Sequence, residues 1–142
     1  MSDALPAIYL ARHGETAWSR SGQHTGRTDL PLTANGEQQA ASLAKALHGI
    51  VFAAVFTSPL QRAIRTCALA GFAPQAVADA DLVEWNYGAY EGKRTDEIHA
   101  LRPGWNLFRD GCPNGEDAAA VGARADRVIA HVRAASGNVL VI

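Results

Sequence analysis

The sequence has little of what marks disulfide-stabilised, metal-binding or membrane proteins. Its two cysteines, Cys67 and Cys112, lack the spacing of a metal site, so we interpret them as reduced thiols. The five histidines are scattered, and no pair stands at the spacing of zinc ligands. No apolar run is long enough to span a bilayer, and the N-terminus lacks the basic start and apolar stretch of a signal peptide. We therefore expect a cytoplasmic protein with no metal and no membrane partner.

An excess of charge of either sign is also lacking. The formal net charge is −1, which excludes the broad basic surface that nucleic-acid binding requires. An anion site must therefore depend on a few positioned arginines. The length of 142 residues and the 48% hydrophobic content allow one domain with a substantial core. Because the sequence shows no repeats and no linker, we predict a single domain over residues 1–142.

The apolar runs predict strands that alternate with helices. One helix is predicted to begin after Thr33, a suitable N-cap, and to end near Gly49. Another is predicted to open at Ser58 and Pro59, with the serine as its cap and the proline in its first turn. The expected strands cover residues 7–11, 52–56, 76–83 and 139–142, and further helices cover residues 95–101 and 116–135. This order favours a doubly wound α/β fold with a mostly parallel sheet.

The motif Arg12-His13-Gly14-Glu15 directly follows the first predicted strand. Ligands of open α/β sheets bind at that end of the strands. An imidazole can attack phosphorus there, and an adjacent guanidinium can hold the phosphoryl oxygens through paired hydrogen bonds. The alternative interpretation is a histidine that only orders a turn.

Arg62 and Glu84 fit the same chemistry. Arg62 falls in the opening turn of the helix after the second predicted strand, so it can face the same sheet edge as His13 and bind a phosphate. The alternative is a solvated helix arginine. Glu84 is flanked by Val83 and Trp85, and a carboxylic acid in apolar surroundings suits a general acid that protonates a leaving alcohol. Here the alternative is a solvated glutamate at a strand end.

Two loops carry further candidate substrate-binding residues. The loop with Thr25 and Gly26 contains a glycine that allows its backbone to approach a ligand closely. The loop from Tyr87 to Gly92 presents aromatic hydroxyls, which either contact a ligand or pack a turn.

Together these motifs resemble the histidine phosphatase superfamily, also called phosphoglycerate mutase-like. The resemblance is carried by Arg12-His13-Gly14-Glu15-Thr16, Thr25-Gly26, Leu32-Thr33 with Gly36, Ser58-Pro59-Leu60 with Arg62 and Thr66, and Glu84 with Tyr87-Gly88 and Glu91-Gly92. It implies a three-layer α/β sandwich in which His13 is the nucleophile and becomes phosphorylated. Arg12 and Arg62 would bind the phosphoryl group, and Glu84 would donate a proton and later activate water. No metal or other cofactor would be required, because the arginines and helix ends supply positive charge.

The sequence departs from this family at two places. The family often has an asparagine after a tryptophan near the first motif, whereas here Trp18 is followed by Ser19, a shorter candidate donor to the substrate. The family also places a second histidine, followed by glycine, just after a terminal apolar strand such as residues 139–142. Since the sequence ends at Ile142, we expect a domain that is incomplete at its C-terminus and impaired as a catalyst by itself. The remaining histidines do not fit that role and are interpreted as surface residues: His24, His48, His99 and His131.

One further segment bears on the substrate. Residues 104–112, followed by Asn114-Gly115-Glu116, are similar to a subgroup that acts on sugar bisphosphates such as sedoheptulose 1,7-bisphosphate. Four basic residues could bind a second phosphate at the rim or could be solvated surface charges: Lys93, Arg94, Arg102 and Arg109.

The leading prediction is a phosphatase that hydrolyses a small phosphorylated metabolite through phosphohistidine. One alternative is phosphoryl transfer of the phosphoglycerate mutase type. Mutases of the family tend to carry a longer, arginine-rich insertion after the Glu84 region, so the short stretch from Gly92 to Glu116 favours hydrolysis. The other alternative, without a second histidine, is a non-catalytic phosphate-binding module. No pattern in the sequence predicts the oligomeric state.

Overall fold

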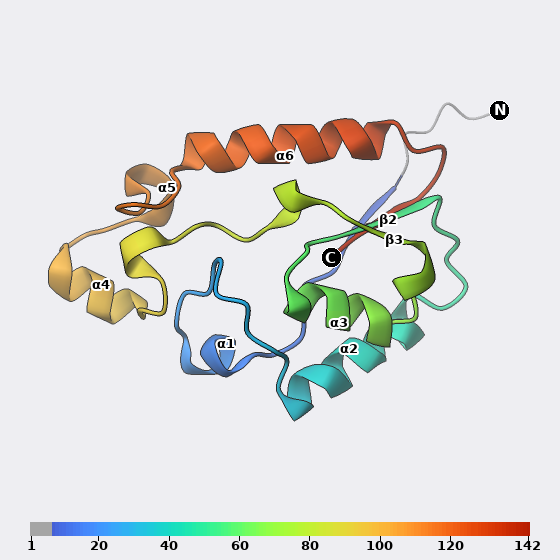
Figure 1. Ribbon diagram of the computed structural model, residues 1–142, viewed down its shortest axis with the longest axis horizontal. Helices are drawn as coiled ribbons and strands as arrows, with labels where there is room; N and C mark the ends of the chain where they lie inside the picture. Colours follow the sequence, from blue (N-terminus) through green and yellow to red (C-terminus); the bar gives the residue numbers. More distant parts are fainter. Residues whose placement is uncertain (1–6) are drawn as a thin grey trace.

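Four short parallel strands form the centre of the structure, a computed structural model that describes residues 7–142 (Figure 1). The strands stand in the order β1-β4-β2-β3. Their bounds are Ile8–Leu10 for β1, Ala54–Thr57 for β2, Ala76–Ala78 for β3 and Val139–Val141 for β4. Residues 1–6 lie outside the described residues. The prediction that the N-terminus carries no signal peptide concerns these residues in part.

β4 is one of the two inner strands of the sheet, although it is the last of the four strands in sequence order. Leu140 is in register with Tyr9 of β1 on one side and with β2 on the other. The strand is buried along its whole length, as a parallel strand covered on both faces must be. Leu140 and Ile142 pack on one face of the sheet, and Val139 and Val141 pack on the other. The apolar run therefore supplies core to both sides.

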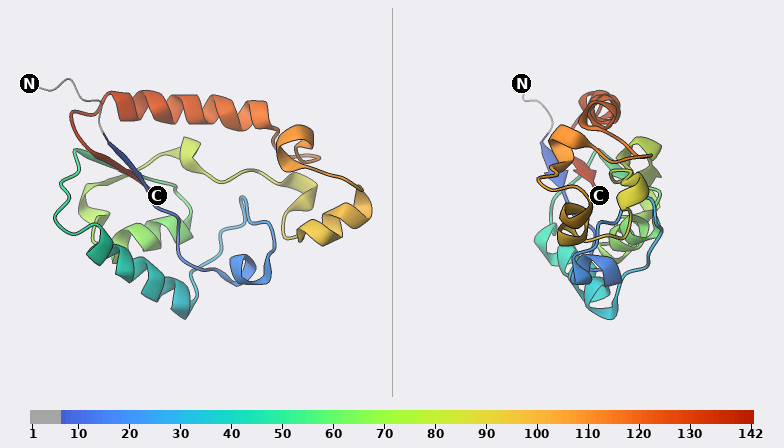
Figure 2. Two further views of the ribbon diagram at one scale, coloured as in Figure 1. Left: turned by 180° about the vertical axis from the view of Figure 1, so that it is seen from behind. Right: turned by 90° about the vertical axis from the view of Figure 1, so that its left-hand side faces the viewer.

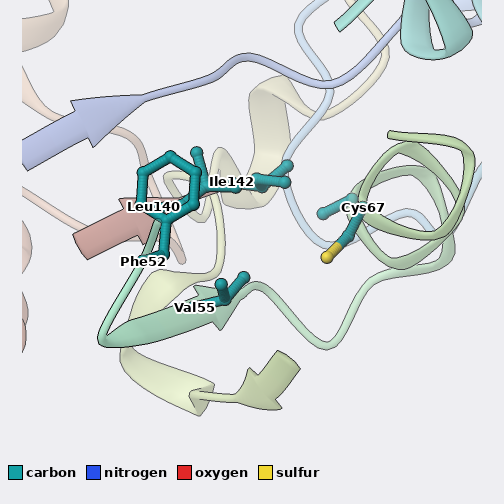
Figure 3. Packing of buried hydrophobic residues seen from close by; sticks show 6 residues of the cluster. Phe52, Val55, Cys67, Leu140 and Ile142 are labelled. Atoms are coloured by element: carbon teal, nitrogen blue, oxygen red, sulfur yellow. The ribbon is translucent and has the colours of Figure 1, made fainter. Parts of the chain in front are cut away.

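Helices cover both faces of this sheet. α2 (Ala34–Ala46) and α3 (Gln61–Leu69) lie on one face, and α6 (Ala118–Arg133) lies on the other (Figures 1 and 2). The core on the α3 side contains Phe52, Val55, Cys67, Leu140 and Ile142, as Figure 3 shows. The predicted three-layer α/β sandwich with a parallel sheet is thus confirmed. None of the helices within residues 7–142 combines the length and the apolarity that crossing a bilayer requires.

A second apolar cluster lies among the segments beyond the C-terminal ends of the strands. There α1 (Ala17–Ser21), α4 (Thr95–Leu101) and α5 (Leu107–Asp110) are joined by long loops (Figure 1). The cluster is made of Trp85, Tyr87, Tyr90, Ile98 and Trp105. The Trp105 indole N–H donates to the carbonyl of Gly111 at 2.8 Å, so its one polar group is satisfied inside the cluster. These contacts hold the loop that contains Glu84 near the sheet edge.

The N-terminal caps of α2 and α3 were both predicted from local sequence, and only the first prediction is confirmed. The prediction for α2 is confirmed at its start, since the Thr33 side chain accepts a hydrogen bond from the Gly36 N–H. The predicted cap of α3 was wrong. The helix begins at Gln61, and the Gln61 N–H donates at 2.8 Å to a carboxylate oxygen of Asp29, not to Ser58. The cap thus comes from a loop far away in the sequence.

The strand predicted over residues 76–83 was too long. β3 ends at Ala78, and a 3₁₀ turn, Ala80–Leu82, follows it. Asp79 caps this turn, because its side chain accepts a hydrogen bond from the Asp81 N–H. A short polar side chain that bonds its own backbone competes with strand pairing, and here it ends the strand.

Candidate active site

The loop after β1 is held against the start of α2 by a contact that only glycine permits. A Cβ on Gly14 would lie 2.2 Å from the Gly36 carbonyl oxygen, well inside any real contact. The Gly14 N–H donates at 3.1 Å to Thr66 of α3. Thr33 supports the same loop, since its N–H donates to the Glu15 carbonyl and its hydroxyl donates at 2.7 Å to the Glu15 carboxylate. The backbone around His13 is therefore fixed by two helices.

The His13 imidazole is oriented and kept neutral. Its Nδ1 lies 2.8 Å from the Gly14 carbonyl oxygen, and because a carbonyl only accepts, Nδ1 carries the proton and Nε2 keeps its lone pair. Burial lowers the pKa of His13 below its ordinary value of 6.5. The positive charges of Arg62 and Arg12 lower this pKa further. The hydrogen bond to the Gly14 carbonyl and the negative charge of Glu84 act in the opposite direction and raise it. A neutral imidazole with a free Nε2 is the form that can attack phosphorus.

Arg62 is a buried cation without a carboxylate partner. Only 2% of the residue is exposed. Its Nη1 donates to the Thr28 carbonyl at 2.9 Å, and its Nη2 donates to the Gly26 carbonyl at 2.8 Å. Within the described part of the chain, no carboxylate oxygen comes within 4.0 Å of the guanidinium. Buried charges are normally paired, so this guanidinium, with most of its five N–H groups still free, suits an anionic ligand.

Four predicted residues come together around one cavity of about 210 Å³, although they come from three segments that are far apart in the sequence. Arg12, His13, Arg62 and Glu84 all line it, together with Ile142 from the end of β4. Arg12 and His13 also line an adjoining cavity of about 280 Å³. The side chain of Glu84 is exposed, and one of its carboxylate oxygens accepts a hydrogen bond from the Trp85 N–H at 2.9 Å. A phosphoryl group in the first cavity would meet two guanidinium groups, an imidazole and a carboxyl group.

The loop at Gly26 is held by a residue to which the sequence analysis assigned no role. One carboxylate oxygen of Glu91 accepts hydrogen bonds from the N–H groups of Gly26, at 2.8 Å, and Thr28, at 3.2 Å. Glu91 thus accepts hydrogen bonds from the N–H groups of this loop, while Arg62 donates hydrogen bonds to the carbonyl groups of the same two residues. The other carboxylate oxygen of Glu91 is buried and has no hydrogen-bond partner among residues 7–142. Nothing in the local sequence signals this contact, since it joins segments far apart in the chain.

The other predicted substrate-binding residues lie near the site but engage the protein itself. Gly26 is needed for packing, because a Cβ there would lie 2.2 Å from the Trp85 carbonyl oxygen. The Thr25 hydroxyl donates to the Gln23 carbonyl at 3.3 Å. The Ser19 hydroxyl donates to the Thr16 carbonyl within α1, although Ser19 lines the adjoining cavity.

Tyr87 and His24 form a stacked pair. The side chain of Tyr87 is buried, and burial together with the nearby Glu84 raises its pKa to about 12, so the hydroxyl stays protonated. The His24 ring lies 4.8 Å from the Tyr87 ring and 5.7 Å from that of Trp105. The interpretation of His24 as a simple surface residue was therefore wrong, because it packs in the aromatic cluster. His48, His99 and His131 are exposed, as predicted.

Most of the predicted basic rim is tied up in ion pairs. Arg94 pairs with Asp96 at 3.2 Å, while Arg102 and Arg109 both pair with Asp110 at 3.3 and 2.8 Å. These contacts favour surface ion pairs over a second phosphate site for the three arginines. Among residues 7–142, no three histidine, cysteine, aspartate or glutamate side chains gather as metal ligands would.

Comparison with known proteins finds relatives across the described chain. The profile of the histidine phosphatase superfamily (branch 1) matches residues 8–142. The sedoheptulose 1,7-bisphosphatase of Saccharomyces cerevisiae is 40% identical over 157 residues, which cover 94% of this chain and 58% of that protein. An acid phosphatase of Mycobacterium tuberculosis is 42% identical over 125 residues, which cover 87% and 61%. The chain thus spans about three fifths of the length of these relatives.

Solved structures show the same likeness. The product of an open reading frame of Mycobacterium tuberculosis matches with a TM-score of 0.88 at 39% identity, over 95% of this chain and 72% of that one. A phosphoglycerate mutase from Thermus thermophilus matches with a TM-score of 0.74 at 36% identity, over 94% and 75%. The shared fold therefore extends over nearly the whole of this chain.

Proposed function

Because the chain belongs to branch 1 of the histidine phosphatase superfamily, we propose that its protein hydrolyses small phosphomonoesters through a phosphohistidine at His13. The observation that carries this proposal is the pairing of a neutral imidazole with the buried, carboxylate-free guanidinium of Arg62. One supplies a nucleophile, and the other supplies a fixed positive charge where the phosphoryl group must lie.

In the first step, Arg12 and Arg62 bind the equatorial oxygens of the phosphoryl group. The Nε2 lone pair of His13 forms a bond to phosphorus while the bond to the ester oxygen breaks. Glu84 gives its proton to that oxygen, which leaves as an alcohol. In the second step, water attacks phosphorus, Glu84 takes a proton from it, and the bond between phosphorus and Nε2 breaks. Inorganic phosphate leaves, and both residues return to their starting forms.

The substrate class is a small phosphorylated metabolite, such as a sugar phosphate or bisphosphate. Support comes from the names of two relatives, a sugar bisphosphatase and an acid phosphatase. A mutase is the second candidate, since another relative, from Klebsiella pneumoniae, is named a probable phosphoglycerate mutase. The short segment between Gly92 and Glu116 favours hydrolysis over transfer. We further propose a cytoplasmic location, supported by two free thiols that lie in separate clusters, Cys67 and Cys112.

The test is a single-turnover reaction with a ³²P-labelled sugar phosphate, followed by denaturation and electrophoresis. We expect a labelled protein band that is lost in acid, that chases into inorganic phosphate, and that forms equally in EDTA. His13→Ala should abolish it. A binding module without catalysis would instead give no band while His13→Ala left the affinity for the phosphate ester unchanged. Label that passed to a second substrate hydroxyl rather than to water would establish the mutase.

A further inference from the structure

An ion pair that takes no part in the proposed chemistry lies next to the loop that contains Glu84. Arg124 of α6 and Glu116, just before that helix, are both largely buried, with 12% and 14% of their side chains exposed. They form a bidentate pair, with Nε to Oε2 at 2.8 Å and Nη2 to Oε1 at 2.9 Å. This geometry fixes the plane of the guanidinium and leaves Nη1 for other acceptors.

Arg124 binds the backbone on the N-terminal side of Glu84. Its Nη1 donates to the carbonyl oxygens of Asp81 and Val83, both at 2.8 Å. Val83 is the residue directly before Glu84. The guanidinium therefore holds the peptide group that leads into the proposed general acid.

Glu116 binds the backbone on the other side. Its Oε1 accepts a hydrogen bond from the Asn86 N–H at 2.8 Å, and its own N–H donates to the Asn86 carbonyl at 2.8 Å. Its carbonyl oxygen accepts from the indole N–H of Trp85 at 2.9 Å. Arg124 and Glu116 thus hold residues 83, 85 and 86 by hydrogen bonds and form none with the Glu84 side chain.

This grip matters because no helix or strand fixes Glu84. It lies in an irregular stretch between two 3₁₀ turns, Ala80–Leu82 and Gly88–Tyr90, and its side chain is exposed. A proton donor that is displaced by about 1 Å can cost about 100-fold in rate. The direction of Glu84 is set by its flanking peptides, and those peptides are held from α6.

We propose that Arg124 and Glu116 act as a positioning pair for Glu84 and are required for the proton transfer to the leaving oxygen. The proposal rests on the proposed phosphatase function. It assigns the pair no role in phosphate binding or in the attack by His13. Because Glu84 is also the proposed base for water, the pair serves the second step as well.

The test uses two substrates that differ in their need for a proton. An alkyl phosphate such as glycerol phosphate has a poor leaving group that must be protonated, whereas 2,4-dinitrophenyl phosphate expels a stable phenolate without help. Arg124→Lys keeps the charge, but a lysine cannot form the bidentate pair with Glu116 and also donate to both carbonyl oxygens that Arg124 binds. We expect the rate of His13 phosphorylation in a single turnover to fall about 100-fold with the alkyl phosphate in this variant, whereas the rate with the dinitrophenyl ester is retained.

Two comparisons sharpen the result. In a Glu84→Gln background, Arg124→Lys should cause no further loss, because the group that it positions is already disabled. Arg127→Met is the matched control, since Arg127 lies one turn further along α6 and pairs with the carboxylate of Asp81, not with a backbone carbonyl near Glu84. Its kinetics should equal those of the unaltered protein.

An equal loss of the phosphorylation rate with both esters in a folded Arg124→Lys protein would overturn the proposal, as would additive losses in the double variant. If the unaltered protein hydrolyses neither ester, the proposed function fails. The pair is then judged by hydrogen exchange of the Trp85 and Asn86 amides. Faster exchange in Arg124→Lys than in Arg127→Met would support the positioning of this loop by the pair, and equal exchange would overturn it.

Discussion

Glu91 offers a direct test of how the loop at Gly26 is held. Glu91→Ala removes the oxygen that accepts from the Gly26 and Thr28 N–H groups and leaves both donors without a partner. A hydrogen bond to a charged group contributes about 1.5–3 kcal/mol, so two of them suggest a loss of about 3–6 kcal/mol. The substitution also removes a buried oxygen that has no partner, which returns about 1–3 kcal/mol. We expect a net loss of about 2–3 kcal/mol in the free energy of unfolding.

The matched variant is Glu91→Gln. Its carbonyl oxygen can keep both accepted bonds, and the buried negative charge disappears, so the free energy of unfolding should change by less than about 1 kcal/mol. Urea denaturation followed by tryptophan fluorescence measures both variants. The reasoning is refuted if Glu91→Gln is as unstable as Glu91→Ala, because the charge and not the pair of accepted bonds would then hold the loop. It is equally refuted if both variants match the unaltered protein.

Two further outcomes follow from the geometry of the loop after β1. Gly14→Ala should lower the free energy of unfolding by at least about 1–3 kcal/mol, because its Cβ would collide with the Gly36 carbonyl. Gly122→Ala in α6, where a Cβ meets open space, should instead raise the free energy of unfolding by about 0.5–1 kcal/mol. Calorimetry of both variants measures the difference. In an NMR titration, the His13 ring should take up its proton below pH 6.5, because burial lowers its pKa, and Glu84→Gln should lower the midpoint further, because Glu84 opposes that shift. A midpoint at or above 6.5 would contradict the proposed neutral nucleophile. The rate of attack by His13 should therefore be retained above this midpoint and should fall as the pH drops through it, because the protonated imidazole has no free lone pair.

Much of the fold could be predicted from local patterns. The strand at residues 139–142 was evident because four consecutive apolar residues suit a strand that is buried on both faces. The start of α2 followed from Thr33, and the predicted bounds of α4 are those observed. The convergence of Arg12, His13 and Arg62 followed from their places after a strand and at a helix start, since such places share one edge of a parallel sheet. Glu84 lines the same cavity from an irregular stretch, because the strand predicted to lead up to it ends at Ala78.

The parts that could not be predicted depend on hydrogen bonds between distant segments. Asp29 caps α3, Glu91 binds the loop at Gly26, and Arg124 binds the carbonyl of Val83. Each partner looks like an ordinary surface charge when only its neighbours in sequence are considered. Their directions are set by how the loops beyond the sheet pack together, which has no periodic signature.

The last of the four described strands is one of the two inner strands of the sheet, and this has a consequence for how the protein is made. While β4 is still inside the ribosome, β1 has no neighbour and β2 lacks one of its two partners, so the sheet cannot close on the part already synthesised. The pairing of Tyr9 with Leu140 joins segments far apart in the sequence, and such contacts form slowly. A nascent chain that stalls before residue 139 therefore exposes the strand edges that promote aggregation, whereas a loss at the edge of a sheet would leave the remaining strands paired.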